Sequence, residues 1–225
     1  MKKLLIALSG SCAVFTGAAH AADIGPVMDP AKWYVHLGAE GVLFDSALNS
    51  GTISGVPLPA TAAAHVTNNL TASIEVGRYV TDNISFSLSA GLPPTNDIYG
   101  DGALAGLGRI GSATYGAFII GGQYHITSLG QFKPYVGAGV SYDVIFGTSD
   151  GSIIKNFHVD NGFGFALQAG AEYDISEHIG LFVDAKKLFA NAHATGNEFG
   201  SPKLPMDANL RLNPWLVSAG LNIRF

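Results

Sequence analysis

Apolar and polar residues alternate in several short segments, and this feature most narrows the folds that the chain can adopt. In ISFSLSAGL (84–92), apolar side chains stand at every even position, with serine or glycine between them. In the C-terminal WLVSAGLNIRF (215–225), apolar residues occupy the odd positions. Because successive side chains of a strand point to opposite faces, this period of two predicts β-strands with one apolar face.

The N-terminus predicts export from the cytoplasm. Residues 1–21 contain two lysines, a run of apolar and small residues, and the cleavage pattern Ala19-His20-Ala21, which together are typical of a secretory signal peptide. The expected mature domain is therefore 22–225. Cys12, the one cysteine, falls in the removed segment, so no disulfide is expected.

Composition then indicates a membrane protein without spanning helices. Charged residues make up 13% of the chain, against roughly 25% in a typical soluble protein, while hydrophobic residues make up 48%. After the signal peptide, no run approaches the roughly 20 consecutive apolar residues that a transmembrane helix needs. An exported, apolar chain of this kind predicts an all-β fold, a transmembrane β-barrel in the outer membrane of a Gram-negative bacterium.

The alternating segments predict eight antiparallel strands, an even number that suits a small bacterial barrel. They cover 32–44, 70–76, 84–92, 115–126, 133–146, 162–175, 179–190 and the terminal segment from about Ala208. Three connections are short (81–83, 127–132 and 176–178), and four are long (45–65, 93–111, 147–160 and 191–207). Since such barrels have short periplasmic turns and longer extracellular loops, both termini are expected in the periplasm.

The expected inward side chains differ between the two halves of the barrel. Near the periplasm they are polar, and an eight-stranded barrel is just wide enough for its own side chains to fill. Buried charges need partners, so this half is predicted to be a polar plug. Its expected members are Glu75, Glu172, Asp184, Lys186 and Arg224.

Toward the outside the inward residues are apolar, which predicts a lining for an apolar solute. Ordinary filling of the core is the alternative interpretation. The expected lining residues are Val42, Phe44, Ala117, Ile119, Ile145, Leu188, Leu212 and Leu216.

Three prolines suggest how such a solute leaves. Pro93, Pro94 and Pro214 fall at the outer ends of the third and eighth predicted strands, and proline lacks the N–H that a strand ladder uses. One hypothesis is that missing ladder bonds open the wall laterally into lipid. The other is that these prolines only end the strands.

Other classes of function find little support in the sequence. Without Lys2 and Lys3 the chain has 10 basic and 17 acidic residues, which disfavours nucleic acid as a partner. The histidines lack metal-binding spacing, and GLGRIG (106–111) is followed by a predicted strand where a dinucleotide site needs a helix. No cofactor, metal or catalytic residue is predicted, and the chain is not expected to be an enzyme.

The chain resembles the OmpW family of small outer-membrane barrels, including its AlkL-like members, over nearly the whole mature length. The similarity lies in the order and spacing of several pieces, among them LTASIEVGRYVTDNISFSLSAGLPPTNDI (70–98), LGRIGSATYGAFIIGGQYHI (107–126), KPYVGAGVSY (133–142), NGFGFALQAGAEYDI (161–175) and NPW (213–215). The resemblance implies an eight-stranded barrel that passes small hydrophobic molecules from outside into the outer membrane.

The expected partners are therefore outer-membrane lipid, small hydrophobic solutes and, through the terminal aromatic strand, the outer-membrane assembly machinery. A competing function is a sealed barrel that acts through its extracellular loops as an adhesion or receptor surface. A barrel enzyme acting on lipids is the third possibility, and the sequence shows no convincing nucleophile and base for it.

Overall fold

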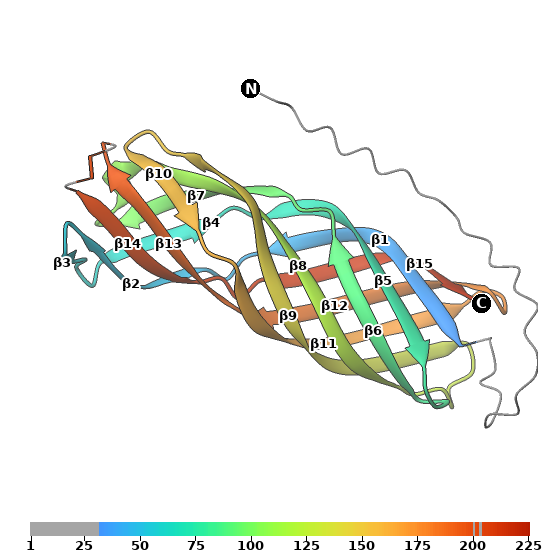
Figure 1. Ribbon diagram of the computed structural model, residues 1–225. Coiled ribbons are helices and arrows are strands. Elements are labelled where there is room, and N and C mark those ends of the chain that lie inside the picture. Colours follow the sequence, from blue (N-terminus) through green and yellow to red (C-terminus); the bar gives the residue numbers. More distant parts are fainter. Residues whose placement is uncertain (1–31, 200, 203) are drawn as a thin grey trace, which may run out of the picture.

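Eight antiparallel strands close into a barrel in the computed structural model, which describes residues 32–199, 201–202 and 204–225 (Figure 1). The predicted all-β, eight-stranded fold is confirmed. The barrel strands are β1 (Trp33–Leu43), β5 (Asn69–Tyr79), β6 (Ile84–Gly91), β8 (Arg109–His125), β9 (Phe132–Asp150), β11 (Gly162–Asp174), β12 (Ile179–Phe189) and β15 (Trp215–Arg224).

The barrel closes because its first and last strands pair with each other as well as with their sequence neighbours. Leu37 of β1 stands opposite Ile74 of β5 on one side and Leu221 of β15 on the other. Side chains alternate between buried and exposed along strands such as β6 and β15, and large apolar residues such as Leu88 and Leu221 are about half exposed. A surface of this kind belongs in hydrocarbon rather than in water.

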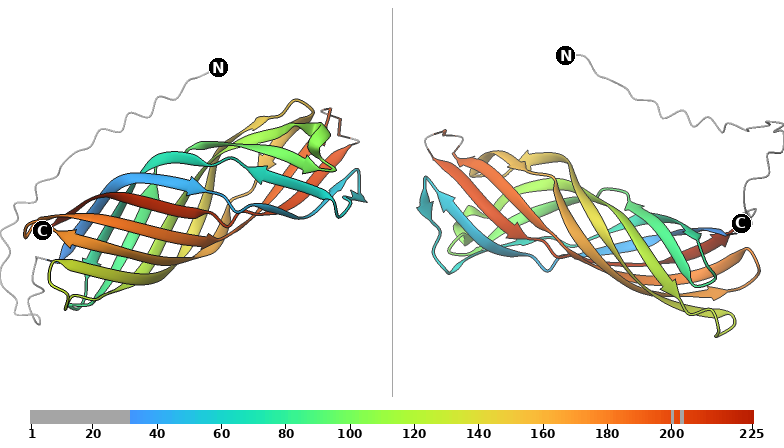
Figure 2. Two further views of the ribbon diagram at one scale, coloured as in Figure 1. Left: turned by 180° about the vertical axis from the view of Figure 1, so that it is seen from behind. Right: turned by 60° about the horizontal axis from the view of Figure 1, so that its bottom comes forward.

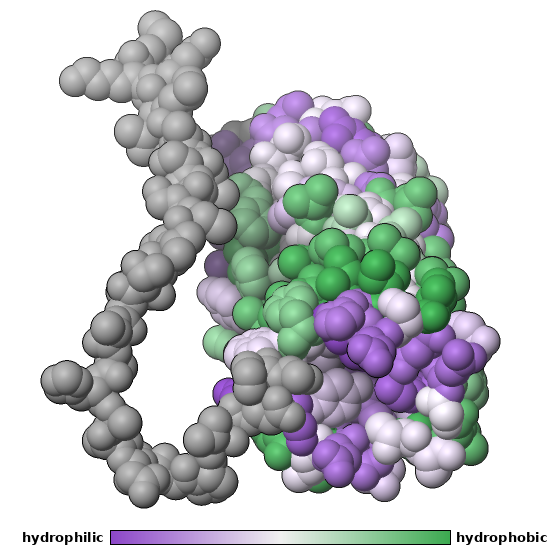
Figure 3. Space-filling model, turned by 90° about the vertical axis from the view of Figure 1, so that its right-hand side faces the viewer, coloured by the Kyte–Doolittle hydropathy of each residue, from purple (hydrophilic) through white to green (hydrophobic). Residues whose placement is uncertain are grey.

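Polar side chains border this apolar surface. Seen from the end at which the C-terminus lies, hydrophobic side chains cover the flank of the molecule, and hydrophilic ones gather beside them (Figure 3). We call this end of the barrel, where the short turns 80–83, 126–131 and 175–178 also lie, the terminal end.

The long connections at the other end are folded, which the sequence did not predict. They form a β-rich continuation of the barrel, here named the extension, which projects away from the terminal end (Figure 2). It consists of β2 (Ala47–Ile53), β3 (Val56–Pro57), β4 (Ala62–Val66), β7 (Thr95–Gly102), β10 (Ile154–Val159), β13 (Asn191–Glu198), β14 (Pro205–Arg211), a short 3₁₀ helix (Ala105–Leu107) and the outer parts of β8 and β9.

Two sheets build the extension. One contains β10, β13, β14, β2 and β3 in that order, and the other continues the barrel sheet through β4, β7 and β8. The prediction that the four long connections are loops is therefore wrong, since each contains paired strands. These connections are 45–65, 93–111, 147–160 and 191–207. Apolar side chains fill the interior of the extension, and this burial favours strands over exposed loops.

The predicted start of the terminal strand, at about Ala208, is also wrong. β14 ends at Arg211, and β15 begins at Trp215 in a different sheet. Between them Asn213 has a positive φ of 37°, and Pro214 follows it. A positive φ breaks an extended conformation, and proline lacks the ladder N–H, so the chain changes sheet at this point.

The predicted signal peptide, residues 1–21, lies outside the described residues. Within the described part of the chain, no helix has the length and apolar character that a membrane span requires.

Candidate functional site: the barrel interior

Charged side chains meet in the middle of the barrel. The Nζ atom of Lys186 lies 3.1 Å from Oε2 of Glu75 and 2.6 Å from Oδ1 of Asp184, and all three side chains are almost completely buried. Ser89 donates a hydrogen bond of 2.7 Å to Glu75. These residues come from β5, β6 and β12, so the cluster connects strands from different parts of the barrel wall.

A second charged group lies nearer the terminal end. Arg224 bonds both Glu172 and Asp174. The ring of His36 connects the two groups, because its Nε2 lies 3.0 Å from Glu172 and its Nδ1 lies 3.5 Å from Glu75. The structure thus brings all five predicted plug residues into one connected network.

Uncharged polar side chains complete this network. Gln123 donates a hydrogen bond of 2.7 Å to Glu75, and Gln168 donates one of 2.8 Å to Asp184. The hydroxyl of Tyr135 donates to Asp184 over 2.8 Å. We call these charged and uncharged polar residues together the polar layer. Its members come from all eight barrel strands and bond one another across the narrow interior that a barrel of this size has.

An apolar layer lies next to the polar layer, on the side of the extension. Its buried members are Val42, Ile119, Ala166, Leu188 and Leu216. Phe44 and Ala117 pack against this layer and also against the larger apolar core of the extension. The predicted lining residues Ile145 and Leu212 belong to that larger core. The eight predicted lining residues therefore all face the interior but belong to two clusters.

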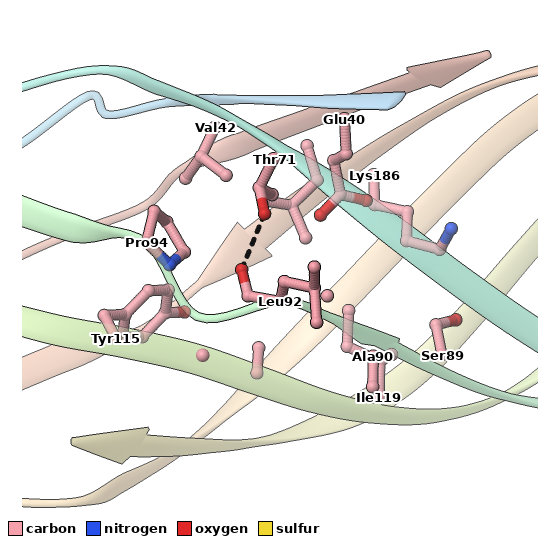
Figure 4. Close-up of a pocket in the computed structure, with 14 residues that line it drawn as sticks. Glu40, Val42, Thr71, Ser89, Ala90, Leu92, Pro94, Tyr115, Ile119 and Lys186 are labelled. Atoms are coloured by element: carbon pink, nitrogen blue, oxygen red, sulfur yellow. Dashed lines mark hydrogen bonds between the residues drawn. The ribbon is translucent and has the colours of Figure 1, made fainter. Parts of the chain in front are cut away.

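A narrow cavity, the wall cavity, lies between the two layers and the barrel wall (Figure 4). Its volume is about 30 Å³, room for about two water-sized groups. Val42, Ile119 and Leu216 form its apolar side, and Glu40 and Lys186, the latter from the polar layer, form its charged side. On the wall it is lined by Ala90, Gly91, Leu92, Pro94, Gly116 and Ala117.

The strand ladder is interrupted at this part of the wall. β6 pairs with β8 as far as Ala90, opposite Phe118, and β7 resumes the pairing at Thr95, opposite Thr114. The prolines in between have no N–H to donate. In the interval the amide of Tyr115 donates to the carbonyl of Pro94 over 3.1 Å. We call this stretch the wall gap.

Leu92, within the wall gap, is hydrogen-bonded to β5, the strand on the side away from β8. Its amide donates a hydrogen bond of 2.8 Å to the carbonyl of Ala72 on β5, and Thr71 donates one of 2.7 Å to the carbonyl of Leu92 (Figure 4). The chain at 91–94 is thus bound to β5 and leaves β8, which places the gap between β6 and β8 rather than between β5 and β6.

Pro214 has a different environment from Pro93 and Pro94. It is fully buried, and its carbonyl accepts a hydrogen bond of 3.0 Å from the amide of Leu188. Asn213 accepts another, of 3.1 Å, from the amide of Ala190. Pro214 does not line the wall cavity. The structure therefore does not bring the three predicted prolines together at one opening.

Two further cavities continue from the wall cavity into the extension. Tyr115 lines both the wall cavity and a second cavity of about 30 Å³, the middle cavity. Ile98, Ala194 and Leu210 line both the middle cavity and a third, of about 20 Å³. Side chains shared in this way place the three cavities in a row, from the outer part of the extension to the wall gap.

Several residues of this row were not predicted from the sequence. Among them, Tyr115 donates a hydrogen bond of 2.8 Å to the buried Asp143, and Asn96 faces the middle cavity. Many others lie in the extension. The alternation in PMDANLRL (205–212), whose Met206, Ala208 and Leu210 are buried, was the signal that could have revealed them.

Relatives of known sequence match nearly the whole chain. An uncharacterized outer-membrane protein, y4mB, of Sinorhizobium fredii is 30% identical over 224 residues, covering 93% of this chain and 90% of the relative. The dibenzothiophene metabolism operon protein PahQ of Pseudomonas aeruginosa is 27% identical over 197 residues, covering 88% and 90%.

Solved structures show the same fold, and the family follows from the sequence profile. The crystal structure of the outer membrane protein OprG from Pseudomonas aeruginosa has a TM-score of 0.80 at 18% identity, covering 87% of this chain and 96% of that chain. The solid-state NMR structure of the outer membrane protein AlkL in lipid bilayers has a TM-score of 0.69 at 24% identity, covering 92% and 96%. The profile of the OmpW family matches residues 31–225, and the chain therefore belongs to the OmpW family of outer-membrane barrels.

Proposed function

We propose that this protein mediates passive uptake of small hydrophobic molecules, which enter through the extension and leave laterally through the wall gap. The observation that carries the proposal is the row of mainly apolar cavities that ends at an interrupted strand ladder. No catalytic step is assigned to the protein, since movement down a concentration gradient needs none.

The direction of transport depends on the orientation in the membrane. We infer that the terminal end faces the periplasm and that the extension faces the outside, because the turns at the terminal end are short. We also infer that the assembly machinery recognises β15, which ends beside the exposed Phe225.

Orientation has a direct test with single cysteines. Ser54 lies in the exposed turn between β2 and β3, and Ser128 lies in an exposed turn at the terminal end. On intact cells, a membrane-impermeant maleimide should label Ser54→Cys and should label Ser128→Cys only after lysis. The reverse pattern would place the extension in the periplasm.

The polar layer is proposed to prevent a solute from continuing to the periplasm. An apolar molecule there would have to separate Lys186 from Glu75 and Asp184, which leaves buried charges without partners. Apolar side chains surround the solute only as far as the wall cavity. Sideways movement into hydrocarbon through the wall gap costs no such separation of charges.

Opening of the wall gap is proposed to control the exit. The cavities are narrow, so a solute passes only when the side chains and strands around it move apart. At the wall gap few ladder bonds oppose this movement, because Pro93 and Pro94 have no N–H. A second opening at Pro214 stays a prediction. There the amides of Leu188 and Ala190 donate hydrogen bonds to the segment 213–214.

The name of one relative supports an apolar solute. PahQ is described as a protein of a dibenzothiophene metabolism operon, and dibenzothiophene is a flat aromatic molecule with no charge. A compound of this class gains roughly 25 cal/mol for each Å² of apolar surface that it removes from water.

A disulfide across the wall gap tests the lateral exit. A Cβ atom on Gly116 would lie 3.4 Å from Cβ of Pro93, close to the roughly 3.5–4.5 Å that a disulfide spans. In Gram-negative cells, oxidised Pro93→Cys/Gly116→Cys protein should reduce uptake of radiolabelled naphthalene to that of cells lacking the protein. A reducing agent should restore uptake, because it lets the strands separate again.

A second disulfide serves as the matched control. Leu88 and Ile120 stand opposite each other in the intact ladder between the same two strands, and both face outward. Leu88→Cys/Ile120→Cys should leave uptake at the wild-type rate. If the oxidised Pro93→Cys/Gly116→Cys protein takes up naphthalene at the wild-type rate, the wall gap is ruled out as the exit and the opening at Pro214 is favoured. Equal uptake with and without the protein would instead favour a sealed barrel that acts through its extracellular surface.

A further inference from the structure

One buried polar side chain that lines the mainly apolar middle cavity has a free hydrogen-bonding atom. Asn96 on β7 is 2% exposed, and its Oδ1 atom is buried without a hydrogen-bond partner. Its Nδ2 atom makes only a long contact of 3.5 Å with the carbonyl of Pro94. A buried carbonyl oxygen of this kind destabilises the protein unless something donates to it.

The rest of the middle cavity offers nothing that satisfies this atom. Tyr115 is the other polar lining residue, and its hydroxyl already donates to Asp143. The remaining lining residues have apolar side chains, among them Phe44, Ile98 and Leu212. A water molecule needs about two to four polar partners, so it would be poorly held beside this single free atom.

We propose that the middle cavity binds apolar molecules carrying one hydroxyl group, with Asn96 as the residue that recognises the hydroxyl. The hydroxyl donates to the free amide atom, and the hydrocarbon part contacts the apolar walls. These walls move apart to admit a ring, because the cavity at rest has a volume of only about 30 Å³. A hydroxyl also accepts hydrogen bonds, so it would satisfy either orientation of the Asn96 amide. A few placed polar groups in an apolar cavity are the usual means by which a site orients its ligand.

This inference rests on the proposed function, because the solute must enter the extension before it meets Asn96. It deepens that function by adding a preference. Oxygenated aromatic or aliphatic molecules would be held longer in the middle cavity than hydrocarbons of the same shape. A site with a hydrogen-bonding group discriminates in this way because the group stays unpaired when the hydroxyl is missing.

Two isosteric probes and one substitution test the preference. p-Cresol and p-xylene differ by a hydroxyl in place of a methyl group, and Asn96→Leu replaces the amide by an apolar side chain of similar size. Affinities would be measured on the full protein in lipid nanodiscs, from the NMR methyl signals of Ile98, Leu210 and Leu212. Asn96→Leu should shift the ratio of the two dissociation constants by roughly fivefold in favour of p-xylene.

A second buried asparagine provides the matched control. Asn222 is fully buried in the barrel, also has unpartnered side-chain atoms, and does not line the middle cavity. Asn222→Leu should leave the ratio unchanged. If Asn96→Leu also leaves it unchanged while both probes bind, recognition by Asn96 is wrong and the proposed uptake function stands. If neither probe binds the wild-type protein, both proposals fail.

A measurement on the wild-type protein covers the case in which Asn96→Leu does not fold. p-Cresol should shift the side-chain amide resonance of Asn96, and p-xylene should shift it much less, because only the hydroxyl bonds the amide. Equal shifts from the two probes would overturn the assignment.

Discussion

The ring of Tyr34 occupies the space that a side chain on Gly77 would need. A Cβ atom on Gly77 would overlap the end of the ring, whose hydroxyl donates a hydrogen bond of 2.6 Å to Gln123. Tyr34 is completely buried and stands opposite Gly77 in the β1–β5 ladder. A large inward side chain on one strand is thus accommodated by glycine on the next.

Gly77→Ala is therefore expected to lower the free energy of unfolding by about 1–3 kcal/mol, because the methyl group overpacks the interior. Urea unfolding in lipid vesicles, followed by tryptophan fluorescence, measures the change. Gly41→Ala is the control, since the nearest atom to a Cβ there is 3.8 Å away. The double variant Gly77→Ala/Tyr34→Ala should lose less free energy of unfolding than the sum of the losses in the two single variants. Additive losses would show that the two side chains do not compete for space.

Lys186 is expected to be essential for the stability of the polar layer. Lys186→Met keeps the length of the side chain but leaves Glu75 and Asp184 without their cation, which should cost about 3–5 kcal/mol in the same unfolding experiment. The exposed pair of Lys32 and Asp82 provides the contrast, and Lys32→Met should change stability by at most about 1 kcal/mol. Similar small losses in both variants would mean that water reaches the polar layer.

Ala194 is placed to test the row of cavities, because it lines both cavities of the extension and is 1% exposed. Ala194→Leu should slow uptake of naphthalene severalfold by filling the passage between them. Thr195 lies next to it on the opposite face of β13, so Thr195→Leu should leave uptake unchanged. If the two variants take up naphthalene at the same rate, solutes do not pass through the extension.

The extension should respond to pH through His193. Its ring nitrogens lie 2.8 Å from Asp160 and 2.8 Å from Asp207, and these hydrogen bonds raise the pKa of His193 above 6.5. The same ring lowers the pKa of Asp160 below 3.8. The part of the stability due to His193 is complete below pH 6.5 and is lost as pH rises through its raised pKa. The part due to Asp160 is present above pH 3.8 and is lost as pH falls through its lowered pKa.

An NMR titration of the His193 ring measures the effect. The midpoint should lie above pH 6.5, and Asp160→Asn should move it down, because the substitution removes a negative charge. The combined stabilisation of the extension by His193 and Asp160 is therefore largest between about pH 4 and pH 6.5. A midpoint that Asp160→Asn does not change would show that the two side chains are separated in solution.

The sequence by itself determined the barrel strands and the faces of their side chains. Hydrocarbon outside and a polar interior require opposite chemistry on alternate residues, so the period of two in ISFSLSAGL was enough to assign Leu88 to the outside and Ser89 to the inside. The same parity identified Glu75, Glu172, Asp184, Lys186 and Arg224 as inward residues, although it did not say which of them pair.

Only the tertiary structure decided the extension, the row of cavities and the different environments of the prolines. The extension strands are short, and small residues such as Ala192, Ala194 and Ala208 fill much of their inner face, so their alternation with polar neighbours has little hydrophobic contrast. They are stable as strands because partners far away in the sequence cover that face. The break between Ala90 and Thr95 likewise exists only relative to β8, since a ladder gap is a property of two strands and cannot be read from one.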